Sequence, residues 1–281
     1  MLTKIEKDFA IGGDLHVSRI GFGAMRLTGK GIWGQPEDKA QALQVLKCAI
    51  DLGVNFIDTA DSYGPDVSEQ LIAEALYPYP RDLVIGTKGG LLRSGPNIWT
   101  PDASPKHLKE ALDGSLKKLR VDRIDLYQLH RIDPKVPAAE TFAFLKQAQA
   151  EGKIKHIGLS EVNVQEIKHA EQFFRVVSVQ NMYSVDNRKW ENVLKYCEDN
   201  GIAFIPWYPL NAGAVEKSKI LHEIAQARSS TIHQVALSWL LHKSNNILLI
   251  PGTSSVQHLE ENMKSASLIL NDSDLQALEK L

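Results

Sequence analysis

The chain has 281 residues, of which 43% are hydrophobic and 23% are charged, and its formal net charge at pH 7 is −2. This balance offers no basic field for nucleic acid or an anionic membrane, and two cysteines without a CxxC spacing argue against a disulfide framework or metal cluster. The sequence has no bilayer-length apolar run and no signal-peptide core, so we expect a cytoplasmic protein that binds neither nucleic acid nor membrane, and we expect a monomer, with an oligomer as the alternative.

The first predicted element is a β-hairpin over residues 9–17, where Gly12, Gly13 and Asp14 interrupt an apolar stretch. We expect this hairpin to lie before the main fold in the chain and to cover the bottom of it.

Eight short apolar runs follow, each separated from the next by a polar turn and an amphipathic stretch. They are continuous rather than alternating in character, which is typical of strands that are covered on both faces. The runs are residues 20–25, 55–59, 83–88, 124–130, 154–160, 176–182, 202–208 and 247–250.

The stretches between the runs carry helix signals. Ser104 before Pro105 predicts a helix start, and Gly201 predicts a helix end. Ser230 or Thr231 predicts the start of another helix, and Asn271 with Asp274 predicts the start of a final one.

Strand followed by helix, eight times, predicts a (β/α)8 TIM barrel formed by residues 1–281 as one domain. A doubly wound sheet is the alternative fold. It is less favoured because Gly21-Phe22-Gly23 lacks the third glycine of a dinucleotide-binding turn.

Polar residues mark the ends of three consecutive predicted strands: Asp58, Lys88 and His130, with Tyr63 in the turn after Asp58. Barrel enzymes place their chemistry at the carboxyl ends of strands, and neighbouring strands lie roughly 5 Å apart, so we expect these side chains to converge. Each also has a plain structural explanation, such as an Asp58–Lys88 ion pair that only joins two strands.

A phenol beside a lysine suits proton donation. The ordinary pKa of tyrosine is about 10, and we expect the Lys88 ammonium to lower it, while Asp58 holds Lys88 in place. A neutral His130 can orient a substrate oxygen, and the hydride has to come from a cofactor. Paired glycosidase carboxylates, HExxH and GxSxG are absent from the sequence, so we expect no metal and no hydrolase chemistry.

Seven stretches in order resemble the aldo-keto reductase family, and the resemblance covers essentially the whole chain: IGFGAMRL, NFIDTADSYG, VIGTKGG, IDLYQLH, IKHIGLSEV, VVSVQNMYS and LLIPGTSSVQHLEEN. The family's catalytic tetrad matches Asp58, Tyr63, Lys88 and His130. The resemblance implies that the protein reduces an aldehyde or ketone to an alcohol, with a nicotinamide cofactor bound across the barrel mouth.

The resemblance also implies a set of cofactor-binding residues, in which Ser160 and Gln180 bind the carboxamide and Trp207 stacks on the nicotinamide ring. The full set is Gly23, Ala24, Met25, Asp58, Ser160, Gln180, Trp207, Tyr208, Pro209, Leu210, Gly213, Gly252, Thr253, Ser254, Ser255, His258, Glu261 and Asn262.

Four positions depart from the family pattern. Glu161 stands where asparagine is frequent, Tyr208 replaces a serine, and Gly252 and His258 replace basic residues near the adenosine phosphate. The resemblance implies NADPH as the cofactor. Gly252 and His258 would bind a 2′-phosphate more weakly than basic residues, so NADH is an alternative.

Two loops are expected to shape the substrate pocket, residues 28–38 with Trp33 and residues 89–103 with Trp99, although both tryptophans could instead pack on the surface. The stretches GKGIWGQP and YGPDVSEQLIAEALYPY resemble the pyridoxal reductase branch, which implies pyridoxal as the leading substrate. The alternatives are a reductase of broad specificity, a nicotinamide-binding regulatory protein, and a barrel enzyme of unrelated chemistry.

Overall fold

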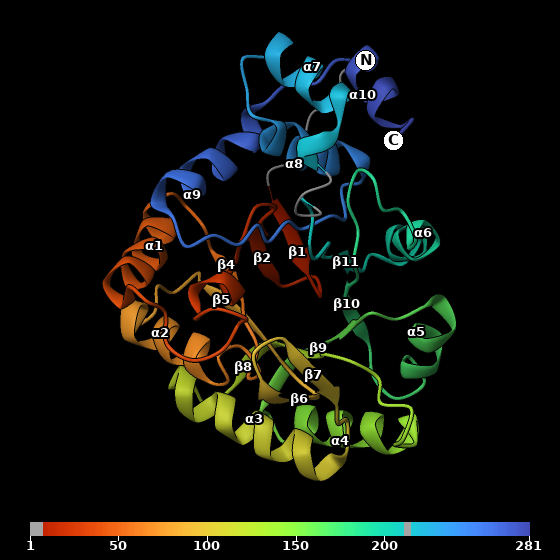
Figure 1. Ribbon diagram of the computed structural model, residues 1–281. Coiled ribbons are helices and arrows are strands. Elements are labelled where there is room, and N and C mark those ends of the chain that lie inside the picture. Colours follow the sequence, from red (N-terminus) through yellow and green to blue (C-terminus); the bar gives the residue numbers. More distant parts are fainter. Residues whose placement is uncertain (1–7, 211–214) are drawn as a thin grey trace.

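A curled parallel sheet forms the centre of the molecule in the computed structural model, which describes residues 8–210 and 215–281 (Figure 1). Gly213 therefore lies outside the described residues. The sheet has the strand order β11-β10-β9-β8-β5-β4-β3. Its strands are β3 (Phe22–Gly23), β4 (Phe56–Asp58), β5 (Val84–Gly89), β8 (Ile124–Leu129), β9 (Ile154–Ser160), β10 (Val176–Gln180) and β11 (Ala203–Phe204).

The eighth apolar run, residues 247–250, closes the sheet into a barrel. Parallel bridges join Ile247 to Phe204 on one side and Leu249 to Ile20 on the other. The backbone N–H of Gly21 also donates to the Leu249 carbonyl at 2.8 Å. The predicted (β/α)8 barrel is thus confirmed, although this run pairs through single bridges rather than through a continuous ladder.

Helices surround the strands on the outside of this barrel, as Figure 1 shows. They are α1 (Lys39–Asp51), α2 (Val67–Leu76), α3 (Pro105–Leu119), α4 (Ala138–Ala150), α5 (Val164–Ala170), α6 (Glu191–Asn200), α7 (Lys219–Ala227), α8 (Ile232–Lys243), α9 (Val256–Met263) and α10 (Asp272–Leu278). Short 3-10 turns are η1 (Ala24–Leu27), η2 (Val215–Lys217) and η3 (Lys264–Ser267). No helix in the described ranges is long and apolar enough to cross a bilayer.

The helix ends follow the sequence signals. Ser104 Oγ accepts a hydrogen bond from the backbone N–H of His107, and Gly201 ends α6 with a φ of 64°. Thr231, not Ser230, caps α8 in a reciprocal capping box, and Asn271 does the same for α10. These caps satisfy backbone groups that have no partner within their own helix.

The amino-terminal hairpin consists of β1 (Asp8–Ile11) and β2 (Leu15–Ser18). Its buried Ile11, Leu15 and Val17 pack against side chains inside the barrel, among them Phe56 and Leu126. In Figure 1 the hairpin lies across the centre of the ring of strands. The predicted cover of the barrel bottom is confirmed, because these apolar side chains seal the core from water.

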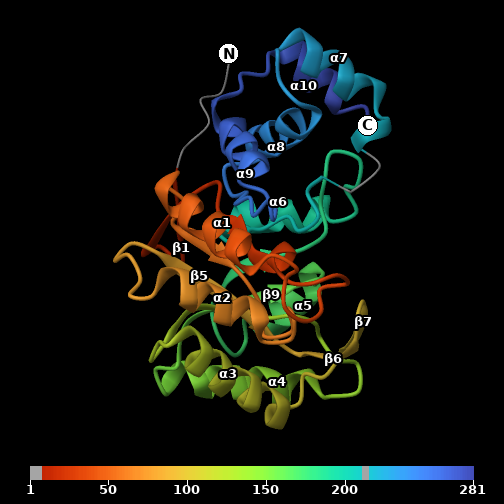
Figure 2. The ribbon, with the colours of Figure 1, turned by 60° about the vertical axis from the view of Figure 1, so that its left-hand side comes forward.

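A second hairpin was not foreseen from the sequence. Within the expected loop of residues 89–103, β6 (Leu91–Gly95) pairs antiparallel with β7 (Ile98–Pro101). Figure 2 places this hairpin on the side of the molecule opposite β1. It therefore stands at the carboxyl ends of the barrel strands, where the site residues lie.

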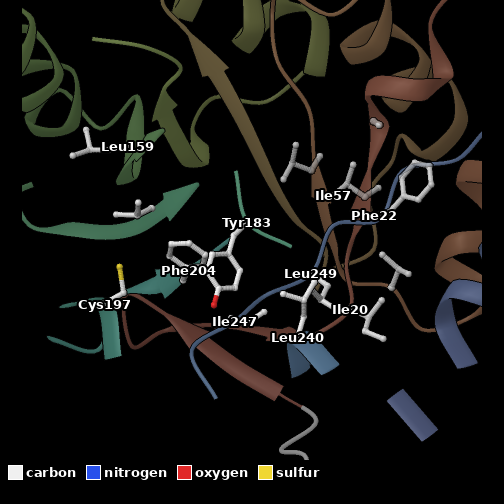
Figure 3. Close-up of a cluster of buried hydrophobic side chains, with 14 of the residues drawn as sticks. Ile20, Phe22, Ile57, Leu159, Tyr183, Cys197, Phe204, Leu240, Ile247 and Leu249 are labelled. Atoms are coloured by element: carbon white, nitrogen blue, oxygen red, sulfur yellow. The ribbon is translucent and has the colours of Figure 1, made fainter. Parts of the chain in front are cut away.

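A larger apolar cluster fills the layer between the barrel and its helices. Figure 3 shows part of it, with Ile20, Phe204 and Leu249 grouped around the closure of the barrel. Cys197 is fully buried in this layer, whereas Cys48 is half-buried.

The close approach of β3 to the segment after residue 250 gives a first prediction. Gly23 has an ordinary φ of −89°, but a Cβ there would lie 2.5 Å from the Ile250 carbonyl oxygen. We expect Gly23→Ala to lower the free energy of unfolding by about 1–3 kcal/mol in a urea titration, because the backbones have to separate. Gly114→Ala is the matched control. In α3 the new Cβ meets the flexible end of Lys118, so unchanged or raised stability is expected. Equal stability for both variants would contradict the steric argument.

Candidate active site

The four predicted catalytic side chains converge at the carboxyl ends of three neighbouring strands. Asp58 ends β4, Lys88 lies near the end of β5, and His130 follows β8 directly, while Tyr63 lies in the turn after β4. All four are buried or nearly so, with exposed fractions between 0% and 6%. The burial matters because electrostatic interactions strengthen where water is excluded.

Lys88 is at the centre of this group. Its Nζ lies 2.5 Å from Asp58 Oδ1, 2.8 Å from the Thr59 carbonyl oxygen and 3.5 Å from the Tyr63 hydroxyl. These three contacts occupy the three N–H donors of the ammonium. The structure therefore places a charged lysine beside the phenol oxygen, in the arrangement that the sequence predicted.

Two glutamines hold the other oxygen of Asp58. Gln128 Nε2 donates to Oδ2 at 3.0 Å, and Gln180 Nε2 donates to the same atom at 2.9 Å. The sequence assigned Gln180 to a cofactor and did not single out Gln128. Both side chains fix the carboxylate, so the Asp58–Lys88 pair has a set orientation.

The ionisation of Tyr63 and Lys88 follows from this burial. Burial raises the pKa of Tyr63 above its ordinary value, although the Lys88 ammonium acts in the opposite direction. The prediction of a lowered pKa for the phenol is therefore wrong, because desolvation of the phenolate outweighs its attraction to the ammonium. Burial alone would lower the pKa of Lys88, but Asp58 and Tyr63 together raise it. At neutral pH the site thus holds a neutral phenol and a charged lysine.

His130 is held in its neutral form. Burial, followed by the positive charges of Lys88, Arg131 and Arg93, lowers the pKa of His130 well below its ordinary value. Nδ1 of the imidazole lies 3.3 Å from Ser62 Oγ. Nε2 has no hydrogen-bond partner among residues 8–210 and 215–281, so it is available to a ligand.

The unforeseen hairpin β6–β7 brings Trp99 to this site. The Trp99 ring lies edge-on to Tyr63 at 6.3 Å and to His130 at 6.4 Å between centroids. Trp33 forms a backbone bridge to Gly64. Of the two tryptophans proposed for the pocket, Trp99 contacts the catalytic rings directly.

Arg93 fixes this hairpin. The centre of its guanidinium lies 3.6 Å from the centroid of Trp99, and its five N–H groups donate to five backbone carbonyl oxygens. The acceptors are Gly31, Ile32, Ser62, Gly95 and Ile98, at distances from 2.8 to 3.3 Å. One side chain thus joins the loops after β3, β4 and β5.

We expect Arg93→Lys to lower the free energy of unfolding by about 2 kcal/mol, since lysine supplies three donors and no planar surface. Thermal unfolding measures the loss, and the near-ultraviolet circular dichroism of the tryptophans should change because Trp99 loses its support. Ser94→Ala, at an exposed position of the same strand, is the matched control. If Arg93→Lys had the spectrum and stability of the wild type, Arg93 would not hold these loops together.

The residues expected around a nicotinamide ring come together at the ends of β9 and β10 and after β11. Trp207 Nε1 donates to Glu161 Oε1 at 2.7 Å, and the Met182 N–H donates to the same oxygen at 2.6 Å. Ser160 Oγ accepts from Arg131 Nη1 at 3.0 Å. Glu161, a departure from the family pattern, therefore holds the indole of Trp207 in place. Tyr208, Pro209 and Leu210 follow as half-buried residues.

A cavity of about 530 Å³ lies beside the residues expected for the adenosine end. Met25, Gly252, Thr253 and Ser254 line it, together with the cations Arg26 and Lys30, which the sequence reading did not single out. Neither cation has an ion pair or hydrogen bond in the described part of the chain. The stretch GAMRLTGKG could have indicated these two cations, because it places two basic residues in a glycine-rich loop.

The other residues expected at the adenosine end of the cofactor make hydrogen bonds within the protein or are buried. Ser255 Oγ caps α9 by accepting from the His258 N–H, and Thr253 Oγ1 accepts from the Ser255 N–H. Glu261 accepts from Gln257, and Asn262 is buried. Gly23 and Ala24 are buried, and Gly23 packs against Gly252.

Comparisons with known proteins agree with this geometry. The model of the Aldo/keto reductase family matches residues 19–281. An uncharacterized oxidoreductase of Schizosaccharomyces pombe is 55% identical over 260 residues, which are 92% of this chain and 85% of that protein. Pyridoxine 4-dehydrogenase of Escherichia coli is 41% identical over 273 residues, covering 95% of this chain and 96% of that one.

Solved structures show the same fold. A thermostable aldo-keto reductase in complex with epalrestat has a TM-score of 0.83 at 28% identity, covering 97% of this chain and 98% of that chain. An aldo-keto reductase from Klebsiella pneumoniae, solved in complex with NADPH, has a TM-score of 0.83 at 24% identity, covering 98% and 95%. The chain belongs to the aldo/keto reductase family and is an oxidoreductase of that family.

Proposed function

We propose that this protein reduces aldehydes to alcohols with NADPH, and that pyridoxal, which gives pyridoxine, is its leading substrate. The observation that carries the proposal is the buried contact of Tyr63 with the Lys88–Asp58 pair, next to a neutral imidazole. A carbonyl oxygen placed between the phenol and the imidazole would meet two groups able to donate hydrogen bonds to it.

In the proposed reaction, Tyr63 gives its proton to the carbonyl oxygen of the substrate. The raised pKa of Tyr63 keeps that proton on the phenol at neutral pH. The phenolate that remains is stabilised by the Lys88 ammonium, which Asp58 holds in position. His130 orients the carbonyl through its unoccupied Nε2, and its lowered pKa keeps the ring neutral, so that it adds no charge beside Lys88.

The barrel mouth fits a nicotinamide cofactor. Ser160, Gln180 and Trp207 offer hydroxyl, amide and indole groups beside the catalytic centre. The 530 Å³ cavity offers phosphate groups the cations Arg26 and Lys30, which have no partner among residues 8–210 and 215–281. When bound, the reduced cofactor supplies the hydride that no side chain can provide. Arg26 and Lys30 favour NADPH over NADH, because a 2′-phosphate adds negative charge for them to neutralise.

Two observations support pyridoxal as the substrate. The E. coli relative at 41% identity is a pyridoxine 4-dehydrogenase. In this chain the indole of Trp99 stands next to Tyr63 and His130, so an aromatic aldehyde would have an aromatic ring to pack against.

The test is the oxidation of NADPH by the purified protein, followed by absorbance, when pyridoxal is added. We expect turnover with pyridoxine as the product, identified by chromatography. Turnover with simple aldehydes but none with pyridoxal would assign a general reductase instead. Failure to oxidise NADPH with every aldehyde and ketone tried would overturn the proposed activity and leave a nicotinamide-binding protein.

A further inference from the structure

Two arginines flank the catalytic centre, and their hydrogen bonds distinguish them. Arg93 uses all five of its N–H groups on backbone carbonyls, as described above, so it has no donor left for a ligand. Arg131 directly follows His130 and is only half-buried. Its hydrogen bonds come from Nη1 alone, which donates to Ser160 Oγ at 3.0 Å and to the His130 carbonyl oxygen at 2.5 Å.

Arg131 therefore keeps Nε and Nη2, with three N–H donors, free of partners in residues 8–210 and 215–281. Its guanidinium carbon lies 5.7 Å from the centroid of Trp207, and its hydrogen bonds hold it beside His130 and Ser160. A half-buried guanidinium with unused donors is costly to leave unpaired. Nε and Nη2 of Arg131, its free edge, are therefore suited to bind a hydrogen-bond acceptor of a ligand.

Burial lowers the pKa of Arg131, and the Glu161 carboxylate acts in the opposite direction without forming an ion pair with it. Among the described residues it forms no ion pair within 4.0 Å, and nearby Glu161 uses Oε1 to hold Trp207 and the Met182 backbone. Asp58, the other carboxylate of the centre, is already paired with Lys88. The reacting centre therefore has more positive than negative charge, with Lys88, Arg93 and Arg131 against Asp58 and Glu161. Consistent with this, Arg131 acts to lower the pKa values of both His130 and Tyr63.

We propose that Arg131 determines specificity by binding an anionic oxygen that the substrate carries close to its carbonyl group. Pyridoxal has such an oxygen, since its ring hydroxyl lies on the carbon next to the aldehyde-bearing carbon and ionises at neutral pH when the ring nitrogen holds the proton. The free edge of Arg131 pairs with this oxygen and so turns the aldehyde toward Tyr63 and His130. This inference rests on the proposed function, because it names the feature by which the same site selects among aldehydes.

The inference separates two aldehydes that share a pyridine ring. Pyridine-4-carbaldehyde has the ring and the aldehyde of pyridoxal but lacks its ring hydroxyl, methyl and hydroxymethyl groups, so it offers Arg131 no anionic oxygen. A site built to bind a polar group discriminates strongly against an analogue without that group, since its own buried donors then stay unpaired. We expect the wild type to prefer pyridoxal in kcat/KM.

The experiment compares the ratio of kcat/KM for pyridoxal to kcat/KM for pyridine-4-carbaldehyde in three variants. Because every variant meets the same two substrates, their different intrinsic reactivities cancel. Arg131→Met should lower this ratio about tenfold or more. Arg131→Lys, which keeps the charge but not the fork of donors, should give an intermediate ratio. Arg123→Met, which removes an exposed arginine outside the site, is the matched control and should keep the wild-type ratio.

A second readout does not depend on turnover. Inhibition by the product pyridoxine should weaken about tenfold in Arg131→Met, while inhibition by pyridine-4-methanol should change little. Quenching of protein fluorescence by NADPH shows whether the variant still binds its cofactor. If the wild type and Arg131→Met share the same substrate ratio and inhibition constants, the inference is wrong and the proposed reductase function stands. If the wild type reduces neither aldehyde, the proposed function itself fails.

Discussion

Tyr63→Phe is expected to lower kcat for carbonyl reduction by about 10²–10⁴-fold, because the substitution removes the phenolic proton that lies beside Lys88. Steady-state oxidation of NADPH measures the loss, and NADPH quenching of protein fluorescence should show binding close to that of the wild type. The aromatic ring remains, so the contacts with Trp99 and His130 are kept.

The matched control is Tyr127→Phe. Tyr127 is fully buried on β8, and its hydroxyl has no hydrogen-bond partner among the described residues. Removing this hydroxyl should leave kcat unchanged and stability equal or higher. If Tyr63→Phe retained more than a tenth of the wild-type kcat, another group would have to supply the proton.

The raised pKa of Tyr63 also fixes the direction of its pH dependence. A phenol whose pKa lies above its ordinary value of about 10 stays protonated at neutral and mildly alkaline pH. Single-turnover reduction by the wild type should therefore show no loss from Tyr63 ionisation between pH 7 and about pH 9. If the wild type and Tyr127→Phe lost rate near neutral pH and Tyr63→Phe did not, the Tyr63 phenol would ionise at a lower pH than expected.

Lys88→Met is expected to be the most destabilising of these substitutions, by about 3–5 kcal/mol in the free energy of unfolding, measured by urea denaturation at pH 7. The side chain is completely buried, and its removal leaves the Asp58 carboxylate without a counter-charge. The reductase rate should fall as well, because the phenolate of Tyr63 loses its ammonium.

A double variant separates the ion pair from packing. Asp58→Asn combined with Lys88→Met removes both charges, so it should recover part of the stability that Lys88→Met loses, without recovering activity. If the double variant were less stable than Lys88→Met, the buried charge would not be the cause of the loss.

The pH dependence of this ion pair follows from Lys88. Its pKa is raised in the folded protein, so its contribution to stability is fully present below the ordinary lysine value of about 10.4 and is lost as pH rises through the folded value. The difference in stability between wild type and Lys88→Met should thus be constant from pH 6 to 9 and shrink only at strongly alkaline pH.

The sequence by itself determined the barrel and most of its catalytic centre. The apolar runs are continuous because both faces of a parallel strand are covered, and local caps such as Asn271 bond within their own turn, so both can be predicted without distant contacts. Asp58, Lys88 and His130 were predictable because a charged or polar residue at the end of an apolar strand has few structural explanations.

Only the tertiary structure decided the surroundings of that centre. The pKa of Tyr63 depends on how much water the folded chain excludes, and its direction was predicted wrongly from one neighbouring charge. The hairpin β6–β7 could not be foreseen because Arg93, on which Trp99 stacks, is held by the carbonyls of Ile32 and Ser62, some 30 to 60 positions away. The same holds for Arg131: whether an arginine is paired or has free donors depends on which side chains the fold brings near it, and residue order alone does not record that.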